Sequence, residues 1–294
     1  MAIMVLDIGG TAIKSGLYID GELTDIRETP TEAQKGKAHV VNCAKEIITD
    51  YQQHSAFERI GISTAGQVDP VRGEILYANE NIPDYTGTKL KEIMEQQFHV
   101  PACVENDVNA AAIGESVFGA GKGYKEFVCL TYGTGVGGAI FTNGKLYTGS
   151  SFSAGEFGAI VTHPEARFAD QNIFSGCYEE YASTTALVKN AKRFDFSLSN
   201  GRKIFERFDE PDVKALVDRW ILEIVYGLTT IIHMLNPECA ILGGGIMEQP
   251  YVLEQLREKL YPNLISSFRQ VKIEKAALGN RAGMLGAAVL HERR

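Results

Sequence analysis

The sequence of 294 residues predicts an α/β protein made of two related domains that face each other across a cleft. Strand-like and helix-like segments alternate along the chain, and one order of elements occurs twice. Each half begins with a strand, a glycine-rich turn and a hairpin, and later runs through a helix into a strand that ends in glycine. We therefore expect one domain over residues 1–118, completed by a closing helix over 281–294, and a second domain over 119–280.

The first half opens with the apolar run IMVLDIG, residues 3–9. We expect a strand here rather than a signal peptide, because the run has no basic flank or small-residue cleavage site. Asp20 and Gly21 separate two apolar runs and indicate a hairpin. The remaining predicted elements of this half are helices over 39–54, 88–99 and 109–119 and strands over 58–64 and 101–107.

The second half repeats this plan. Asn143 and Gly144 indicate its hairpin, and apolar residues at helical spacing predict one long helix later in the half. The segment 190–210 has mixed polarity and supports no functional prediction. The main predicted elements are strands over 127–133 and 238–245 and a helix over 211–238.

The composition excludes several classes of protein. Hydrophobic residues make up 45% and charged residues 22%, which is typical of a globular domain. The net charge of −8 argues against nucleic-acid binding, which needs a basic face, and no apolar run is long enough to span a membrane. The five cysteines are scattered and odd in number, without a CxxC pair, which fits a reducing cytoplasm. We expect a cytoplasmic protein whose partners are small molecules.

The stretch YGTGVGGAI contains the spacing G-x-G-x-x-G at Gly133, Gly135 and Gly138. In a dinucleotide-binding protein these glycines open a helix. Here β-branched and aromatic residues and the Asn-Gly turn follow, which predicts a strand and a hairpin and argues against a nicotinamide cofactor. The stretch GAGKG is not a P-loop, because Gly123 stands where Ser or Thr must follow the lysine.

Three glycine turns at corresponding places of the two halves favour nucleotide binding instead. The first glycine turn (residues 7–11) offers close backbone approach, the Thr11 hydroxyl, and a carboxylate at Asp7 that can hold Mg²⁺ directly or through water. The second (133–138) can cradle phosphate with backbone N–H groups and the Thr134 hydroxyl, and the third (243–245) can pass under an adenine ring. The predicted nucleotide-binding residues are Asp7, Gly9, Gly10, Thr11, Gly133, Thr134, Gly135, Gly137, Gly138, Gly243, Gly244 and Gly245.

A series of motifs in order resembles the ROK family (repressors, uncharacterised frames and sugar kinases) of the actin-like ATPase superfamily. The resemblance covers nearly the whole chain and implies two actin-like (ribonuclease H-like) domains, ATP with Mg²⁺, a sugar substrate and a homodimer. The motifs are LDIGGTAIKSGLY, GISTAGQVDP, ENIP, VENDVNAAA, YGTGVGGAI, SAGEFG, GCYEEYAS and AILGGG.

The resemblance also implies roles for single residues. It makes Asp107 the catalytic base and places Asn106 beside it as a sugar ligand. Judged without the resemblance, Asp107 would be an N-cap of the following helix, and Lys14 would be either a phosphate neutraliser or an exposed strand charge. Glu156 would be a loop charge and Glu179 part of a solvated helix face. The sugar-binding residues that the resemblance implies are Gly66, Asn81, Asn106, Asp107, Glu156 and Glu179.

The chain departs from the family pattern where many members bind zinc. Ala159 stands at the position of a zinc-binding histidine, and only Cys177 remains of the three cysteines of a CxCGxxGC cluster. One thiol cannot complete a tetrahedral site, and His163 is more plausible as an ordinary core or surface histidine, so we expect no structural zinc. The lost cluster resembles the β-glucoside kinase branch.

These observations predict an ATP-dependent hexose kinase acting on the 6-hydroxyl of glucose in a β-glucoside such as cellobiose or gentiobiose. Free glucose and N-acylmannosamine are alternative substrates, and a sugar-sensing binding protein is the non-enzymatic alternative. A repressor is not expected, because six residues before Asp7 are too few for a helix-turn-helix.

Overall fold

The structure is a computed structural model that describes residues 2–292 of the chain. The chain divides into two compact units. Unit 1 comprises Met1–Lys122, Thr148–Ala154 and Asn280–Arg294, and unit 2 comprises Gly123–Tyr147 and Gly155–Gly279. Unit 1 therefore includes the short segment 148–154, which the predicted domain boundaries place in the second domain.

The sheet of unit 1 has five strands in the order β3-β2-β1-β4-β7. The first three strands form antiparallel pairs, whereas β4 and β7 join them in parallel. Asp20 and Gly21 both have positive φ in the turn between β2 and β3, so the predicted hairpin is confirmed. The strands are β1 (Ala2–Ile8), β2 (Ala12–Ile19), β3 (Glu22–Pro30), β4 (Arg59–Thr64) and β7 (Ala102–Asn106), with a separate pair β5 (Gln67–Asp69) and β6 (Glu74–Tyr77).

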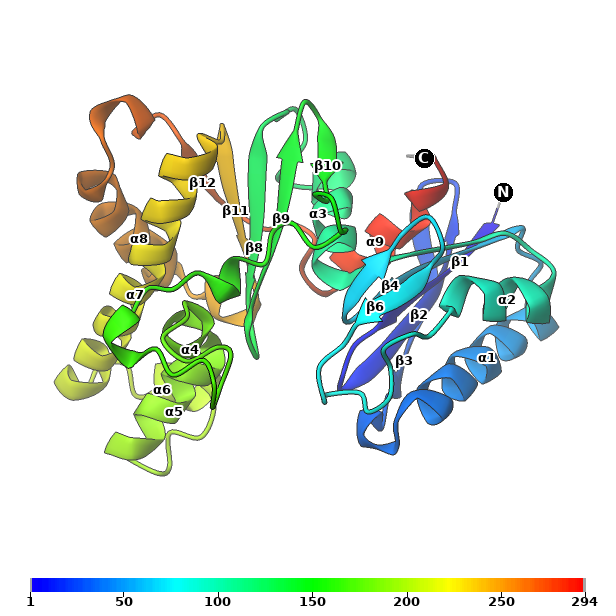
Figure 1. Ribbon diagram of the computed structural model, residues 1–294, viewed down its shortest axis with the longest axis horizontal. Helices are drawn as coiled ribbons and strands as arrows, with labels where there is room; N and C mark the ends of the chain where they lie inside the picture. The colour runs from blue at the N-terminus through cyan, green and yellow to red at the C-terminus, as the bar shows by residue number, and fades with distance from the viewer. Residues whose placement is uncertain (1, 293–294) are drawn as a thin grey trace. The chain divides into compact units, whose positions relative to one another are not determined.

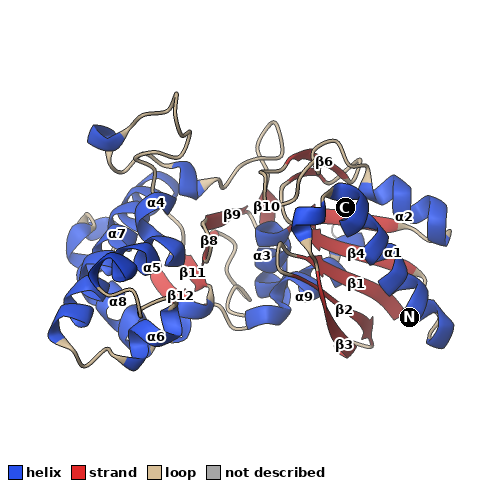
Figure 2. Cartoon of the chain, turned by 90° about the horizontal axis from the view of Figure 1, so that it is seen from below, coloured by secondary structure: helices blue, strands red, loops and turns tan. Residues whose placement is uncertain are grey.

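Helices cover both faces of this sheet (Figure 2). Side chains alternate along β1: Met4 and Leu6 lie in a core with α1 and α2, whereas Val5 packs with Met284 of α9 on the opposite face. The helices are α1 (Lys37–His54), α2 (Leu90–Phe98), α3 (Asp107–Phe118) and α9 (Ala282–Ala288).

The C-terminal helix α9 packs through glycine against α3. A Cβ atom at Gly286 would lie 1.7 Å from the backbone oxygen of Ala110, so only glycine allows this approach. The predicted helix over 281–294 was too long: α9 ends at Ala288, a short 3-10 turn follows at Leu290–Glu292, and residues 293–294 lie outside the described residues.

Unit 2 repeats the topology of unit 1 strand for strand. Its sheet has the order β10-β9-β8-β11-β12, again with an antiparallel hairpin on one side of the first strand and two parallel strands on the other. The predicted match between strands 58–64 and 238–245 is confirmed, because β4 and β11 hold equivalent places (Figure 1). The strands are β8 (Phe127–Tyr132), β9 (Val136–Thr142), β10 (Lys145–Tyr147), β11 (Cys239–Gly243) and β12 (Lys272–Lys275).

The long helix α7 supplies much of the core of unit 2. Its buried face includes Trp220, Ile224 and Leu228, at the spacing that the sequence predicts. The helix ends at Leu235 rather than at the predicted residue 238, because Asn236 adopts a left-handed conformation. The helices of this unit are α4 (Glu179–Ala182), α5 (Thr184–Phe194), α6 (Gly201–Glu206), α7 (Pro211–Leu235) and α8 (Pro250–Asn263).

The segment 190–210, which supports no functional prediction, has a structural explanation. It contains the end of α5 and all of α6, whose N-cap is the side chain of Asn200. Arg207 then joins the ends of the segment through ion pairs of 2.6 Å to Asp195 and 2.7 Å to Glu210. The charges of this segment therefore hold its turns together.

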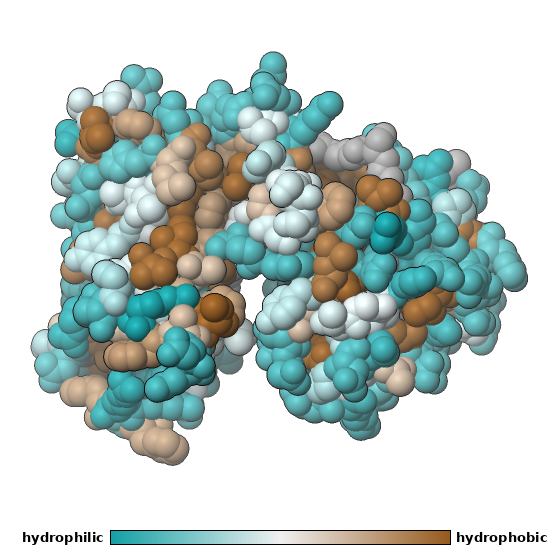
Figure 3. Space-filling view, in the orientation of Figure 1, coloured by the Kyte–Doolittle hydropathy of each residue, from teal (hydrophilic) through white to brown (hydrophobic). Residues whose placement is uncertain are grey.

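Polar residues dominate the face that Figure 3 shows, with smaller apolar patches between them. Among the helices of residues 2–292, none is long and apolar enough to cross a membrane.

Candidate active site

In unit 1, the first glycine turn follows β1 and is open to solvent. Gly9 closes the turn through a hydrogen bond of 3.1 Å from its N–H to the carbonyl oxygen of Ala12, and its own carbonyl accepts the Thr31 hydroxyl at 2.7 Å. Gly10 and Thr11 are exposed. A Cβ atom at Gly10 would meet nothing within 4 Å, so the space beside this backbone is free for a ligand.

Asp7 lies beside this turn with partners from two neighbouring strands. The Ser63 hydroxyl donates to Asp7 Oδ1 over 2.7 Å, and Lys14 Nζ lies 3.7 Å from Asp7 Oδ2. Both partners face Asp7 in the strand register. Lys14 is thus partly buried and pairs with Asp7. Ser63 was missed, although its place at the end of the neighbouring strand could have indicated it.

Asn106 and Asp107 stand where β7 meets α3. Asn106 Oδ1 accepts hydrogen bonds from the N–H groups of Val108 (3.0 Å) and Asn109 (3.1 Å), so Asn106 is the N-cap. The reading of Asp107 as the N-cap was therefore wrong, because Asp107 is the first residue of the helix. Its Oδ1 accepts from Asn106 Nδ2 and from the N–H of Val108, both at 2.9 Å.

The environment of Asp107 favours its neutral form. Burial, together with the negative charge of nearby Asp7, raises the pKa of Asp107 to about 6, against the weaker opposing effect of its hydrogen bonds. A carboxylate with such a pKa is ionised at neutral pH and is a better proton acceptor than an ordinary aspartate. The raised pKa of Asp107 thus suits a general base.

Gly66 joins the same group of residues. Its carbonyl oxygen accepts a hydrogen bond of 2.9 Å from Asn106 Nδ2. Its φ of 97° and the carbonyl of Tyr77, which would lie 2.8 Å from a Cβ atom, both require glycine. Asn81 lies farther along, exposed in the loop after β6, where its N–H donates to Asn79 Oδ1 over 3.1 Å.

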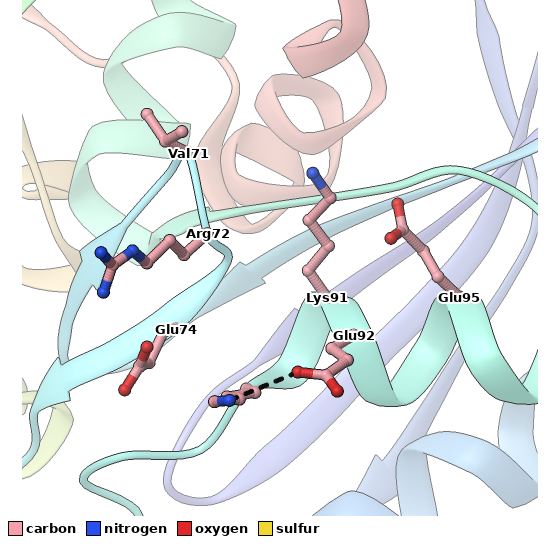
Figure 4. A pocket seen from close by; sticks show the side chains of 7 residues that line it. Val71, Arg72, Glu74, Lys91, Glu92 and Glu95 are labelled. Carbon is pink, nitrogen blue, oxygen red and sulfur yellow. Dashed lines mark ion pairs between the residues drawn. The ribbon is translucent and has the colours of Figure 1, made fainter.

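A surface pocket of about 360 Å³ in unit 1 contains none of the predicted site residues (Figure 4). It is lined by charged side chains of the β5–β6 hairpin and α2, and Lys89 and Glu92 form an ion pair of 3.6 Å beside it. The opposite charges around it offer no single class of ligand a complementary surface.

In unit 2, the second glycine turn connects β8 and β9. A hydrogen bond of 3.0 Å from Gly133 N to the carbonyl of Gly135 shapes the turn, and Thr134 is exposed at its tip. Gly137 and Gly138 lie in β9. A Cβ atom at Gly138 would lie 2.2 Å from the ring of Phe157, so this glycine is required for close packing.

Glu179 lies against this turn, at the start of α4. A Cβ atom at Gly135 or Gly158 would come within 2.6 or 2.8 Å of Glu179 Oε2, and the same oxygen accepts a long hydrogen bond of 3.4 Å from the N–H of Val136. Burial raises the pKa of Glu179, and the charge of exposed Glu156 adds to this effect. Glu179 is thus half-buried rather than part of a solvated helix face.

The third glycine turn meets the second. Gly243 ends β11 and pairs with Thr131, and Gly244 follows with a φ of 103°. A Cβ atom at Gly244 would lie 2.2 Å from the carbonyl oxygen of Tyr132. The second and third glycine turns therefore lie together at the carboxyl ends of β8 and β11, with Glu179 against the second turn.

Side-chain contacts hold the loop 159–177, at which the family resemblance places zinc in many members. His163 accepts or donates hydrogen bonds to Glu223 (2.8 Å) and Glu165 (3.0 Å), while Arg167 Nη1 donates to the carbonyl of Ser175 (2.8 Å) and lies 3.5 Å from Cys177 Sγ. Within residues 2–292, no three His, Cys, Asp or Glu side chains form a metal-binding group.

Comparison with known proteins adds to this geometry. The model of the ROK family matches residues 3–294. A glucokinase of Thermotoga maritima is 30% identical over 98% of this chain and 96% of its own, and a beta-glucoside kinase of Listeria monocytogenes is 31% identical over 98% and 96%. The crystal structure of a ROK family glucokinase from Streptomyces griseus, in complex with glucose and AMPPNP, has 31% identity and a TM-score of 0.84, with 99% of each chain covered.

The fold, the site and these similarities together define an ATP-dependent carbohydrate kinase with the actin-like fold. The chain belongs to the ROK family. The fold class and the family resemblance predicted from the sequence are thus confirmed.

Proposed function

We propose that this kinase transfers the γ-phosphate of ATP to the 6-hydroxyl of a glucose unit in a β-glucoside such as cellobiose or gentiobiose. The observation that supports the reaction is the base site of unit 1: Asp107 has a pKa raised to about 6 and is oriented by Asn106 at the end of β7. Asp107 would accept the hydroxyl proton as the bond from oxygen to phosphorus forms.

The sugar would be held by polar groups that replace its hydration. Each buried hydroxyl needs a hydrogen-bond partner once water leaves. The proposed sugar-binding groups of unit 1 are Asn81, Asn106 and the backbone at Gly66, and those of unit 2 are the carboxylates of Glu156 and Glu179.

The nucleotide would be held by the three glycine turns. In unit 1 the first turn, with Asp7 and the Thr11 hydroxyl, would face phosphate, and in unit 2 the second and third turns would hold phosphate and adenosine. The oxygen donors at Asp7 suit Mg²⁺, which proteins commonly bind through one or two carboxylates together with substrate phosphates. When bound, Mg²⁺ would neutralise developing charge on the phosphate oxygens.

The substrate proposal rests on the loop that replaces a zinc site. Ala159 and the lone Cys177 leave no ligand set there, and His163 is occupied by two glutamates. Glucose is the alternative, because the named relatives include a glucokinase and a beta-glucoside kinase at nearly equal identity. The proposed homodimer and cytoplasmic location rest on the family resemblance and the scattered cysteines.

A substrate panel tests this proposal. We expect ADP release with Mg-ATP and cellobiose or gentiobiose to exceed, in kcat/KM, the release with glucose, N-acetylmannosamine and fructose. Turnover confined to a free monosaccharide would contradict the β-glucoside assignment and keep the kinase. Sugar binding without turnover on any member would favour a sensor.

The pKa of Asp107 predicts a pH dependence. The base acts in its ionised form, so kcat/KM is expected to be level above pH 7 and to fall about tenfold per pH unit below about pH 6. Binding of ADP, measured over the same pH range, serves as the control for loss of the fold. A kcat/KM that stays level down to pH 5 would be inconsistent with Asp107 as the base.

A further inference from the structure

One segment of unit 2, residues 178–185, contacts the second glycine turn repeatedly. The hydroxyl oxygens of Tyr178 and Tyr132 are 2.9 Å apart, and the Thr184 hydroxyl donates to the carbonyl oxygen of Tyr132 over 3.0 Å. The N–H of Thr185 donates to the carbonyl oxygen of Gly133 over 3.3 Å. One short stretch of chain therefore supplies several of the contacts to this turn and to Tyr132, the residue before it.

Glu179 fills the remaining space between this segment and the turn. Its Oε2 atom accepts from the N–H of Val136 and occupies the space where a side chain at Gly135 or Gly158 would have to lie. The N–H of Val136 is thus directed at Glu179. The shape of the turn depends on a side chain that family resemblance assigns to the sugar.

We propose that Glu179 is a positioning residue for the nucleotide-binding turn, acting through Gly135 and Val136, in addition to any contact that it makes with sugar. This inference rests on the proposed function of the second glycine turn. Its consequence is that one carboxylate takes part in both binding sites of unit 2. Glu156 is exposed, and its proposed role is in sugar binding.

Two substitutions separate the contact of Glu179 with the turn from the negative charge of its carboxylate. Glu179→Gln keeps an oxygen acceptor and the side-chain volume but removes the negative charge. Glu179→Ala removes the acceptor, the volume and the charge. Thr184→Val removes the hydrogen bond to the carbonyl oxygen of Tyr132, the residue that precedes the turn, without changing a predicted sugar ligand. Glu156→Ala is the matched carboxylate control.

The experiment is calorimetric titration of each folded variant with ADP and Mg²⁺ in the absence of sugar, followed by KM values for both substrates. We expect Glu179→Ala to bind ADP about three- to tenfold more weakly than Glu179→Gln, which is the range for one lost hydrogen bond. Thr184→Val should weaken ADP binding about threefold with an unchanged KM for sugar. Glu156→Ala should raise only the KM for sugar.

Equal ADP affinities for the two Glu179 variants, together with a wild-type affinity for Thr184→Val, would overturn the inference and leave the kinase assignment intact. Failure of the wild-type protein to bind ADP would overturn the assignment of the turn itself. If Glu179→Ala does not fold, Glu179→Asp takes its place, because its carboxylate is one methylene shorter; an ADP affinity equal to that of Glu179→Gln would then overturn the inference.

Discussion

The substitution Asp107→Asn is expected to lower kcat by about 10²- to 10⁴-fold, the usual contribution of a positioned general base. Asparagine keeps an oxygen that can accept from Asn106 Nδ2 and the N–H of Val108, so the local structure should persist. The change removes the proton acceptor alone. Steady-state ADP release with saturating sugar and ATP measures the effect.

The same substitution should not destabilise the protein. Because the pKa of Asp107 is raised to about 6 in the folded state, ionising it opposes folding, and this cost is present above pH 6 and disappears as pH falls toward 4. Asparagine removes the cost, so unfolding at pH 8 should require about 1–3 kcal/mol more free energy than in wild type. Asp170→Asn, in an exposed loop, is the matched control and should change neither kcat nor stability. An active Asp107→Asn protein would exclude Asp107 as the base.

The substitution Gly286→Ala is expected to cause the largest loss of stability, about 3 kcal/mol or more. The added Cβ atom would lie 1.7 Å from the backbone oxygen of Ala110, and backbone cannot rotate away as a side chain can. Helix α9 would have to move from α3, whose first residue is Asp107. Thermal and urea unfolding measure the change.

Gly201→Ala is the matched control for Gly286→Ala. Gly201 is the first residue of α6, and a Cβ atom there would meet only the Ile246 side chain at 3.4 Å. Its unfolding midpoint should stay the same or rise slightly, since alanine loses less conformational entropy than glycine. A similar midpoint for both variants would show that the contact between α9 and α3 is loose.

Much of the fold could be predicted because its signals are local. The alternation of strands and helices and the turns at Asp20 and Asn143 follow from short-range preferences, and the structure has them where the sequence indicates. The ends of helices were harder to predict. At the start of α3, Asn106 and Asp107 are equally good caps in sequence, and only the backbone path shows that Asn106 takes this place.

The candidate site could be predicted in its residue types but not in its contacts. The pairs of Asp7 with Lys14 and Ser63 depend on strand register, which brings together residues up to 56 positions apart. The contact of Glu179 with Gly135 depends on how α4 packs against β9, and no sequence spacing encodes it. The glycines were expected to let the backbone approach a ligand closely, but Gly138 leaves space for the ring of Phe157 instead.

The equal strand order of the two units implies an ancestral duplication. The two copies now differ in the charge at one equivalent position. Asp7 in β1 and Thr131 in β8 hold equivalent places, each two residues before the first glycine of its turn. Each also pairs with a residue of the neighbouring parallel strand, which is β4 in unit 1 and β11 in unit 2. One copy kept an acidic group there and its cationic partner Lys14, whereas the other has an uncharged hydroxyl. The carboxylate that suits a cation thus stands in unit 1, whereas the equivalent position of unit 2 carries no charge.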